Sequence, residues 1–96
     1  MFTHSPYHFG LIDADEQLVT GAGRLMAFLL FGGSTATDII LYDNTAASGT
    51  ILAKKNVVAN ASKFVDLTNL GGTQFGTGIY GDITGTGALC YVWYEA

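Results

Sequence analysis

The sequence predicts an all-β protein, a single antiparallel β-sandwich of about eight short strands with a jelly-roll-like arrangement. Glycine occurs 13 times and is spread along the chain, whereas proline occurs once. Between the glycine clusters lie short runs rich in β-branched and aromatic residues, and turn signals recur about every 8–12 residues. No stretch of the sequence makes a convincing helix. We therefore expect one domain, residues 1–96, built from strands and turns.

The turn signals divide the chain into strands. The expected strands are Phe2–Phe9, Glu16–Thr20, Arg24–Phe31, Thr37–Asp43, Thr50–Asn56, Lys63–Leu67, Gly78–Thr84 and Ala88–Glu95. Pro6 cannot donate a hydrogen bond to a neighbouring strand, so residues 1–10 are expected to form an edge strand or an arm. Gly85-Thr86-Gly87 is expected to form a tight hairpin turn between the last two strands.

Some of the expected strands are apolar on both faces. Strict alternation puts one set of side chains of residues 24–31 on one face, namely Leu25, Ala27, Leu29 and Phe31, and the other set on the opposite face, namely Met26, Phe28 and Leu30. The last strand alternates in the same way, with Leu89, Tyr91 and Trp93 opposite Cys90, Val92 and Tyr94. Residues 38–43 have the same character, with Ile39 and Leu41 opposite Ile40 and Tyr42. One face can line the interior of a sandwich, and the other needs another partner. The candidates for the core and an oligomer interface are Phe28, Leu29, Tyr42, Tyr91 and Trp93.

Composition favours a protein that is covered in part by another chain. Hydrophobic residues make up 49% of the sequence and charged residues 12%, where about 25% charged is usual. Burial of apolar surface and loss of conformational entropy are both on the order of 140 kcal/mol for a chain of this size, so a lone monomer is marginal. Cys90 is the only cysteine, so no disulfide adds stability. We therefore predict a homo-oligomer.

Charge and hydropathy exclude several classes of protein. The net charge is −4, and four basic residues are too few for a nucleic-acid footprint. The longest apolar run, Leu25–Phe31, is too short for a membrane-spanning helix, and the amino terminus does not look like a signal peptide. A single cysteine fits a reducing compartment. We expect no nucleic-acid partner, no membrane partner and synthesis in a cytoplasm.

Two groups of residues are of types that bind metals, but their spacing does not fit a metal site. His4 and His8 would lie on one face of a strand about 13 Å apart, which is too far for one metal ion. The acidic segment that begins at Asp13 starts like a calcium-binding loop, but its twelfth position is Arg24 where that loop needs a glutamate. We therefore expect polar-face histidines, a solvated acidic turn and no metal site.

Other motifs offer no catalytic chemistry. Residues 71–78 and 85–87 look like phosphate loops, but no helix follows either one and the P-loop lysine is missing. Cys90 lies within an apolar strand, where burial raises the pKa of a thiol. The serines, Ser5, Ser34, Ser48 and Ser62, lack a nucleophile-elbow context. We therefore predict a protein that is not an enzyme and has no catalytic residue and no cofactor.

Two segments carry a family resemblance. "LYDNTAASGT" (residues 41–50) and "FGTGIYGDITGTGALCYVWY" (residues 75–94) resemble small β-structured virion proteins of tailed bacteriophages. The similarity covers Ile39–Thr50 and Phe75–Tyr94, and it departs from the family pattern at Gly81 and Cys90. Within the first segment, Asp43 and Asn44 are expected to close an Asx-turn, and Gly49 to take a positive φ.

The resemblance implies a capsid decoration (cement) protein. Such a protein would self-associate as a trimer and stabilise junctions between subunits of the major capsid protein, on the capsid surface of a virion assembled in the host cytoplasm. The candidate residues for a capsid-gripping arm are Phe2, Tyr7 and Phe9. The alternative is a tail-fibre or spike module that binds carbohydrate or a host receptor, which would expose coplanar aromatic rings beside a pocket. Packing in the core and at interfaces is the other use of the aromatic residues.

Overall fold

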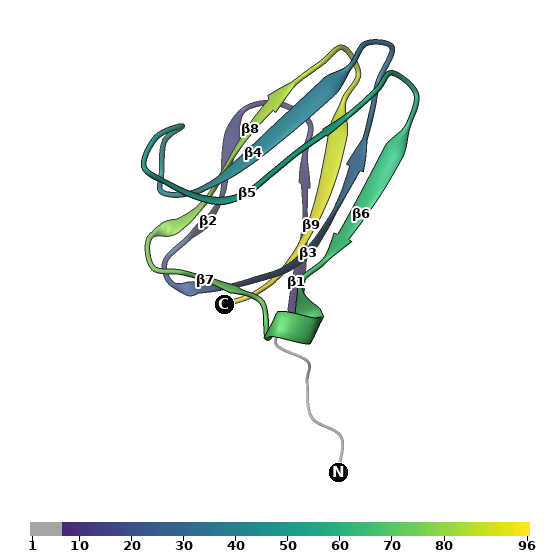
Figure 1. Cartoon of the computed structure of the whole chain (residues 1–96). Coiled ribbons are helices and arrows are strands. Elements are labelled where there is room, and N and C mark those ends of the chain that lie inside the picture. Colours follow the sequence, from purple (N-terminus) through teal and green to yellow (C-terminus); the bar gives the residue numbers. More distant parts are fainter. Residues whose placement is uncertain (1–6) are drawn as a thin grey trace.

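The computed structural model describes residues 7–96 and has the predicted all-β architecture. Two antiparallel sheets pack face to face as a sandwich (Figure 1). The elements are β1 (Tyr7–Ile12), β2 (Glu16–Thr20), β3 (Gly23–Phe31), β4 (Thr37–Asp43), β5 (Thr50–Val57), β6 (Ser62–Asp66), the short 3-10 helix η1 (Thr68–Leu70), β7 (Thr73–Phe75), β8 (Gly78–Thr84) and β9 (Leu89–Glu95).

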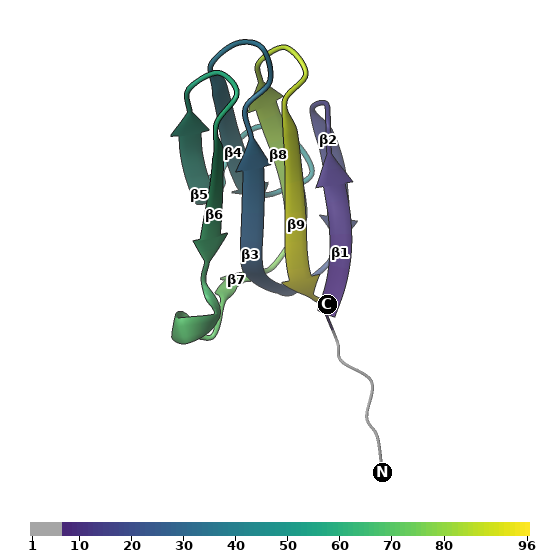
Figure 2. The ribbon, with the colours of Figure 1, turned by 90° about the vertical axis from the view of Figure 1, so that its right-hand side faces the viewer.

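The order of the strands is that of a jelly roll. Sheet A has the order β1-β9-β3-β6, and β7 pairs with the start of β3; sheet B has the order β2-β8-β4-β5. Figure 2 shows the long strands of sheet A in front of those of sheet B. The connections from β1 to β2, β3 to β4, β5 to β6 and β8 to β9 all cross from one sheet to the other. This pattern of double Greek keys confirms the predicted jelly-roll arrangement.

The core lies between the sheets and takes alternate residues from each strand. Its fully buried members are Ile12, Leu25, Phe28, Leu30, Ile39, Leu41, Ile79, Cys90 and Val92. On β9, Cys90 and Val92 point into this core, while Tyr91 and Trp93 lie on the outer face of sheet A and are only half-buried. The prediction that β9 has two apolar faces is therefore confirmed, and β9 lies in the interior of its sheet.

The predicted facing of side chains in β3 is wrong at one end. Strict alternation placed Leu25 on the same face as Ala27, away from Phe28. In the structure the register between β3 and β9 shifts between Leu25 and Ala27, so Met26 is an extra residue that forms a β-bulge. The bulge reverses the alternation on one side of it. Leu25 therefore joins Phe28 and Leu30 in the core, and Ala27 remains on the outer face.

Several strand boundaries differ from the prediction. The first strand was expected to end at Phe9, but β1 continues to Ile12 because its pairing with β9 runs from Tyr7 opposite Glu95 to Ile12 opposite Cys90. The part of that expected strand before residue 7 lies outside the described residues. β7 was missed, because a three-residue strand in a glycine-rich loop is too short to show an alternating pattern. With β7, residues 7–96 contain nine strands. Within residues 7–96, no helix is long and apolar enough to cross a membrane.

The prediction of a hairpin between β8 and β9 is wrong, because this turn connects the two sheets. β8 belongs to sheet B and β9 to sheet A, so the turn at residues 85–87 joins strands that do not pair with each other. This turn packs on the β3–β4 turn, where Ser34 donates its backbone N–H to the Thr86 carbonyl oxygen at 2.9 Å. A Cβ atom at Gly33 would lie 1.7 Å from that same oxygen. The glycine therefore allows the two turns to touch and close this end of the sandwich.

Gly81 has a packing role that the sequence did not reveal. It is buried in the middle of β8, and a Cβ atom there would lie 2.4 Å from the Cδ1 atom of Ile12 on the opposite sheet. Ile12 is fully buried, so its side chain occupies the space that a larger residue at position 81 would need. This close approach of the two sheets explains why position 81 is a glycine.

Candidate functional site

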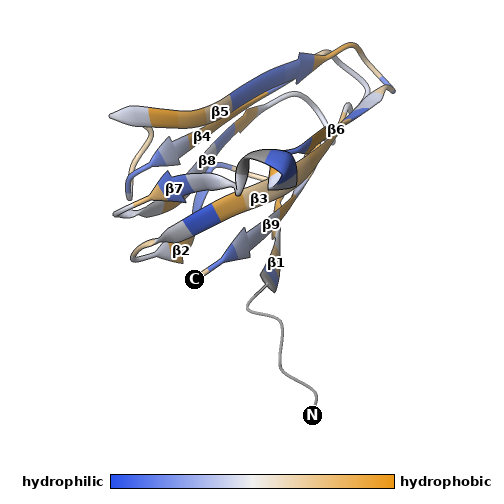
Figure 3. Cartoon of the chain, turned by 60° about the horizontal axis from the view of Figure 1, so that its bottom comes forward, coloured by the Kyte–Doolittle hydropathy of each residue, from blue (hydrophilic) through white to orange (hydrophobic). Residues whose placement is uncertain are grey.

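The outer face of sheet A is the most distinctive surface of the described chain. Cross-strand pairing gathers nine apolar or aromatic side chains there, which we call the aromatic face: Phe9, Leu11, Ala27, Leu29, Phe31, Phe64, Leu89, Tyr91 and Trp93. They come from β1, β9, β3 and β6, so the aromatic face extends across the whole sheet. Figure 3 shows hydrophobic colouring along much of β3, an interior strand of sheet A, and a hydrophilic stretch in β5 of sheet B.

The rings of the aromatic face contact one another. Phe9 stacks on Tyr91 with a centroid separation of 5.3 Å and an interplanar angle of 16°, and it lies 5.1 Å from the Trp93 ring. Phe31 meets Tyr91 edge-on at 5.8 Å, and Phe64 meets Trp93 edge-on at 6.1 Å. Both geometries are favourable for aromatic pairs. These contacts hold the rings in place before any partner binds.

The exposed area of the aromatic face is large for a small domain. Phe9, Phe31 and Phe64 are 55%, 37% and 52% exposed. At roughly 200 Å² per aromatic side chain, these three residues alone leave about 300 Å² of apolar surface in water. Leu11, which is 39% exposed, and the half-buried members of the face add to this area. Apolar patches of about 300–600 Å² are the largest on typical monomers and often mark binding surfaces.

The outer face of sheet B has a different chemistry. Register places Ile40 between Lys54 and Asp82, and it places Asp38 opposite Asn56 on the edge strand β5. Tyr42 lies on this outer face, where it is half-buried and pairs with Tyr80 and Ile51. Charged residues interrupt the apolar ones, so this face is suited to contact with water.

The predicted interface residues fall in three places. Phe28 is 1% exposed and belongs to the core. Leu29, Tyr91 and Trp93 come together on the aromatic face. Tyr42 lies on the opposite side of the sandwich, on the outer face of sheet B. The structure thus groups three of the five residues on one surface, and core packing accounts for Phe28.

The predicted arm residues are distributed differently from the expectation. Phe2 lies outside the described residues, and Tyr7 is the first residue of β1. Phe9 is held within β1, opposite Trp93 in the register of the sheet. Between residues 7 and 10 the segment is therefore an edge strand, and Phe9 acts as part of the aromatic face.

A hollow interrupts the aromatic face beside Trp93. It has a volume of about 340 Å³, and we call it the Trp93 hollow. Its lining residues are Met26, Ala27, Phe64, Asp66, Thr68 and Trp93. Ala27 pairs with Trp93 on one side and with Asp66 on the other, so the smallest side chain of the face forms the floor between them.

Asp66 supplies the charge of the Trp93 hollow. Its Oδ1 atom accepts a hydrogen bond from the Thr68 hydroxyl at 2.6 Å and another from the Thr68 backbone N–H at 2.9 Å. These two hydrogen bonds, the hydroxyl one being the stronger influence, lower the pKa of the Asp66 carboxyl from its ordinary value. The carboxylate is therefore ionised at neutral pH and held by Thr68, in a hollow whose other lining residues are apolar or aromatic.

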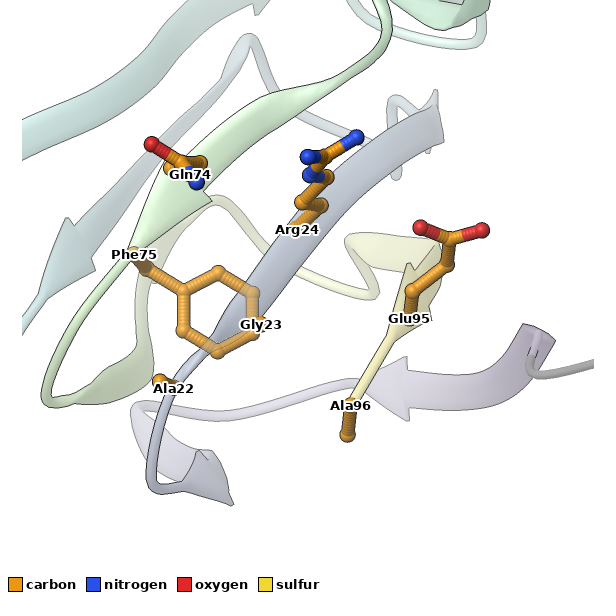
Figure 4. A pocket seen from close by; sticks show the side chains of 7 residues that line it. All are labelled: Ala22, Gly23, Arg24, Gln74, Phe75, Glu95 and Ala96. Carbon is orange, nitrogen blue, oxygen red and sulfur yellow. The ribbon is translucent and has the colours of Figure 1, made fainter.

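A second hollow lies at the end of the sandwich, between β3, β7 and β9. Figure 4 shows Arg24 and Glu95 with their charged groups turned the same way, and the Phe75 ring beside Gly23. A Cβ atom at Gly23 would lie 2.7 Å from that ring, so glycine makes room for it. Arg24 donates to the Gly71 carbonyl oxygen at 3.4 Å, which ties β3 to the loop before β7. Gly23 and Arg24 therefore have structural roles at this hollow.

Asp43 joins two segments that are far apart in the chain, the end of β4 and the turn between β7 and β8. Its carboxylate accepts hydrogen bonds from the backbone N–H groups of Gly76, Thr77 and Gly78, the shortest being 2.8 Å to Thr77. The predicted Asx-turn at Asp43 is therefore wrong, because this side chain reaches the β7–β8 turn. Asn44 makes the local contact, donating to the Ser48 carbonyl oxygen at 2.8 Å.

Replacing Asp43 with asparagine is expected to destabilise the protein by about 1 kcal/mol at pH 7, a value for solvent-screened hydrogen bonds. Hydrogen bonds from the backbone N–H groups of Gly76 and, to a smaller extent, of Thr77 lower the pKa of the Asp43 carboxyl from its ordinary value. A group whose pKa is lowered on folding stabilises the protein above its unfolded pKa, and this stability is lost as the pH falls through the folded pKa. The difference between wild type and Asp43→Asn should therefore shrink below about pH 4.

Urea unfolding at pH 7 and pH 3, with amide exchange at residues 76–78, measures this effect. Asp38→Asn is the matched control, because Asp38 is an exposed carboxylate on the same strand. An equal loss of stability at both pH values would contradict the role of the charge.

The other titratable groups do not assemble into a reactive centre within the described residues. Burial raises the pKa of the Cys90 thiol to about 12, so it is not a nucleophile at neutral pH. Burial, together with the charge of Asp15, raises the pKa of Asp82. Between residues 7 and 96, no group of three or more His, Cys, Asp or Glu side chains is placed to hold a metal ion. His8 stacks on Tyr94 at 5.3 Å, and His4 lies outside the described residues.

Comparison with protein-family models, with curated proteins and with solved structures gives no match for this chain. The surfaces of the sandwich are therefore the remaining indication of its function. Sequence reasoning missed two of their features, the Asp43 contact and the Trp93 hollow. The only signal for the hollow was a single alanine among larger residues in the apolar strand, and the sequence does not place Asp66 beside it.

Proposed function

We propose that this protein is a non-enzymatic structural protein of a tailed-phage virion, a decoration protein that self-associates and stabilises junctions between major capsid subunits. The observation that carries the proposal is the aromatic face. It is apolar, it spans four strands, and its rings are ordered by their mutual contacts. A surface of this kind gains most when another protein chain covers it.

The chemistry of the remaining groups supports a structural role. The two resembling segments meet at Asp43, where the contact orders a turn and offers no reactive group to a substrate. The sole cysteine is buried with a raised pKa. Function would then reside in shape and apolar contact, with a homotrimer as the simplest assembly.

A tail-fibre or spike module that binds carbohydrate is the second candidate. The Trp93 hollow favours it, because an aromatic wall beside a carboxylate can bind a sugar ring through stacking and hydrogen bonds. The fold does not choose between the candidates, since jelly rolls occur in both viral capsid and lectin domains. The stacking of Phe9 on Tyr91 favours the decoration protein, because these rings cover each other and leave less flat surface for a sugar.

Replacing Trp93 with alanine is expected to leave the monomer folded and to weaken self-association at least tenfold. Trp93 lies on the outer face of sheet A, and central aromatic residues dominate the energies of protein interfaces. Sedimentation velocity over a range of concentrations measures association, and binding to purified capsids measures docking. Tyr42→Ala, which removes an aromatic ring from the outer face of sheet B, is the matched control and should leave both unchanged.

Two results would count against the proposal. One is a wild-type protein that is monomeric at all concentrations and does not bind capsids. The other is a Tyr42→Ala variant that loses assembly while Trp93→Ala retains it, which would move the interface to sheet B.

A further inference from the structure

We propose that the Trp93 hollow receives an arginine side chain from a partner protein, with its guanidinium group against Trp93 and paired with Asp66. This inference rests on the proposed function, because it takes the ligand of the aromatic face to be a protein. It adds the chemistry by which the face would recognise that partner.

The hollow has the form of a pocket for one side chain. Cross-strand rows of the aromatic face are filled by large residues, except where Ala27 lies between Trp93 and Asp66. Phe64 meets Trp93 at an interplanar angle of 75°, so two rings form adjoining walls above the alanine floor. Pockets that accept a single anchoring side chain are typical of the centres of protein interfaces, and arginine is among the favoured anchors.

The charge of the hollow selects a cation. The hydrogen bonds from Thr68 both end on Oδ1 of Asp66, so Oδ2 can accept from a ligand. Aromatic walls attract a cation through their ring electrons, most strongly at tryptophan. A ligand therefore binds this hollow best if it has an apolar stem that packs along Ala27 and Phe64 and a positively charged end that pairs with Asp66.

Arginine fits this combination better than lysine or a sugar does. A guanidinium group is planar, stacks on aromatic rings and pairs with a carboxylate through two parallel hydrogen bonds, whereas the lysine ammonium is a strongly hydrated point charge. A sugar ring carries several hydroxyls that need partners. The lining offers few such groups: the indole N–H of Trp93, the Asp66 carboxylate, and the Thr68 hydroxyl, which already donates to Asp66.

The test uses Trp93 as its own reporter, because it is the only tryptophan in the chain. N-acetyl-arginine methylamide is titrated into the wild-type protein while Trp93 fluorescence and the Trp93 indole N–H resonance are followed. We expect a saturable change in the millimolar range. The citrulline analogue, which has the same shape without the charge, should bind at least tenfold more weakly, and the lysine analogue should also bind more weakly than arginine.

Variants locate the site. Asp66→Asn retains the Oδ1 acceptor for Thr68 and removes the charge, and it should weaken arginine binding at least tenfold. Ala27→Leu fills the floor of the hollow and should abolish binding. Asp38→Asn removes an exposed carboxylate from sheet B and should change nothing. The comparison of arginine with citrulline on wild-type protein decides the question even if a variant does not fold.

The outcomes separate this inference from the proposed function. Absence of a saturable change, or equal responses to arginine and citrulline, overturns the arginine pocket. Saturable binding of methyl glycosides with none of arginine overturns it and favours the carbohydrate module. If arginine does not bind but Phe9→Ser still disrupts self-association, only the pocket is wrong. If arginine binds and the protein neither self-associates nor binds capsids, the pocket remains and the decoration function is wrong.

Discussion

A chain that ends at Gly87 is expected not to fold. The truncation removes β9, which lies between β1 and β3 and pairs with both. Its loss separates β1 from the sheet and exposes the backbone edge of β3. It also removes the fully buried side chains of Cys90 and Val92 together with Tyr94, which packs against the core. Each large buried side chain contributes about 1.5–3 kcal/mol, and a small domain has about 5–15 kcal/mol in total.

Circular dichroism and urea unfolding measure this result. We expect the truncated chain to lack a β-sheet spectrum and a cooperative transition. A chain that ends at Tyr94 is the control, because it loses the terminal residues Glu95 and Ala96 and keeps Cys90, Val92 and Tyr94, the three residues of the strand that face the core. A cooperative transition in the chain that ends at Gly87 would show that sheet A is stable without its central strand.

Replacing Phe28 with alanine is expected to cost about 3–5 kcal/mol of unfolding free energy. Phe28 is 1% exposed and is the largest fully buried side chain of the core. It pairs with Val92 and Val65 in sheet A, so its ring fills the space between the sheets near the middle of β3. Removing the ring loses its burial and leaves a cavity that the neighbouring strands cannot fill.

Phe31→Ala is the matched control on the same strand. Phe31 is 37% exposed and lies on the aromatic face, where its ring contacts Tyr91. Its loss should cost about 2 kcal/mol of monomer stability, from the partial burial of the ring together with the aromatic pair. Urea unfolding of dilute protein, where association is negligible, measures both variants. Equal costs would mean that the two faces of β3 are not distinguished as core and surface.

The fold class and most strand positions followed from local features of the sequence. Glycine clusters mark the ends of strands, and alternation of side chains marks the strands themselves, because the pleat of a strand has a period of two residues. Ile39 and Leu41 were therefore recognised as one face of β4, and Cys90 and Val92 as one face of β9. Residues 73–75 were too few to show such a pattern.

The errors occurred where the backbone departs from local regularity. A bulge adds one residue to a strand, and only the pairing partner shows its position. Met26 therefore reversed the facing of Leu25 without any sign in the sequence of β3. The turn at residues 85–87 has the same glycines whether it joins paired strands or crosses between sheets.

Local patterns were enough to predict an all-β sandwich with more apolar surface than its core could bury. The membership of the aromatic face depends on the folded chain, because Phe9, Phe64 and Trp93 lie on three strands that are far apart in the sequence. The Trp93 hollow and the Asp43 contact arise in the same way. Ala27 and Asp66, which line the hollow, are 39 positions apart in the sequence, and Asp43 and Thr77 are 34 positions apart. Contacts at such separations depend on strand order and register, which the local pattern of a strand does not contain.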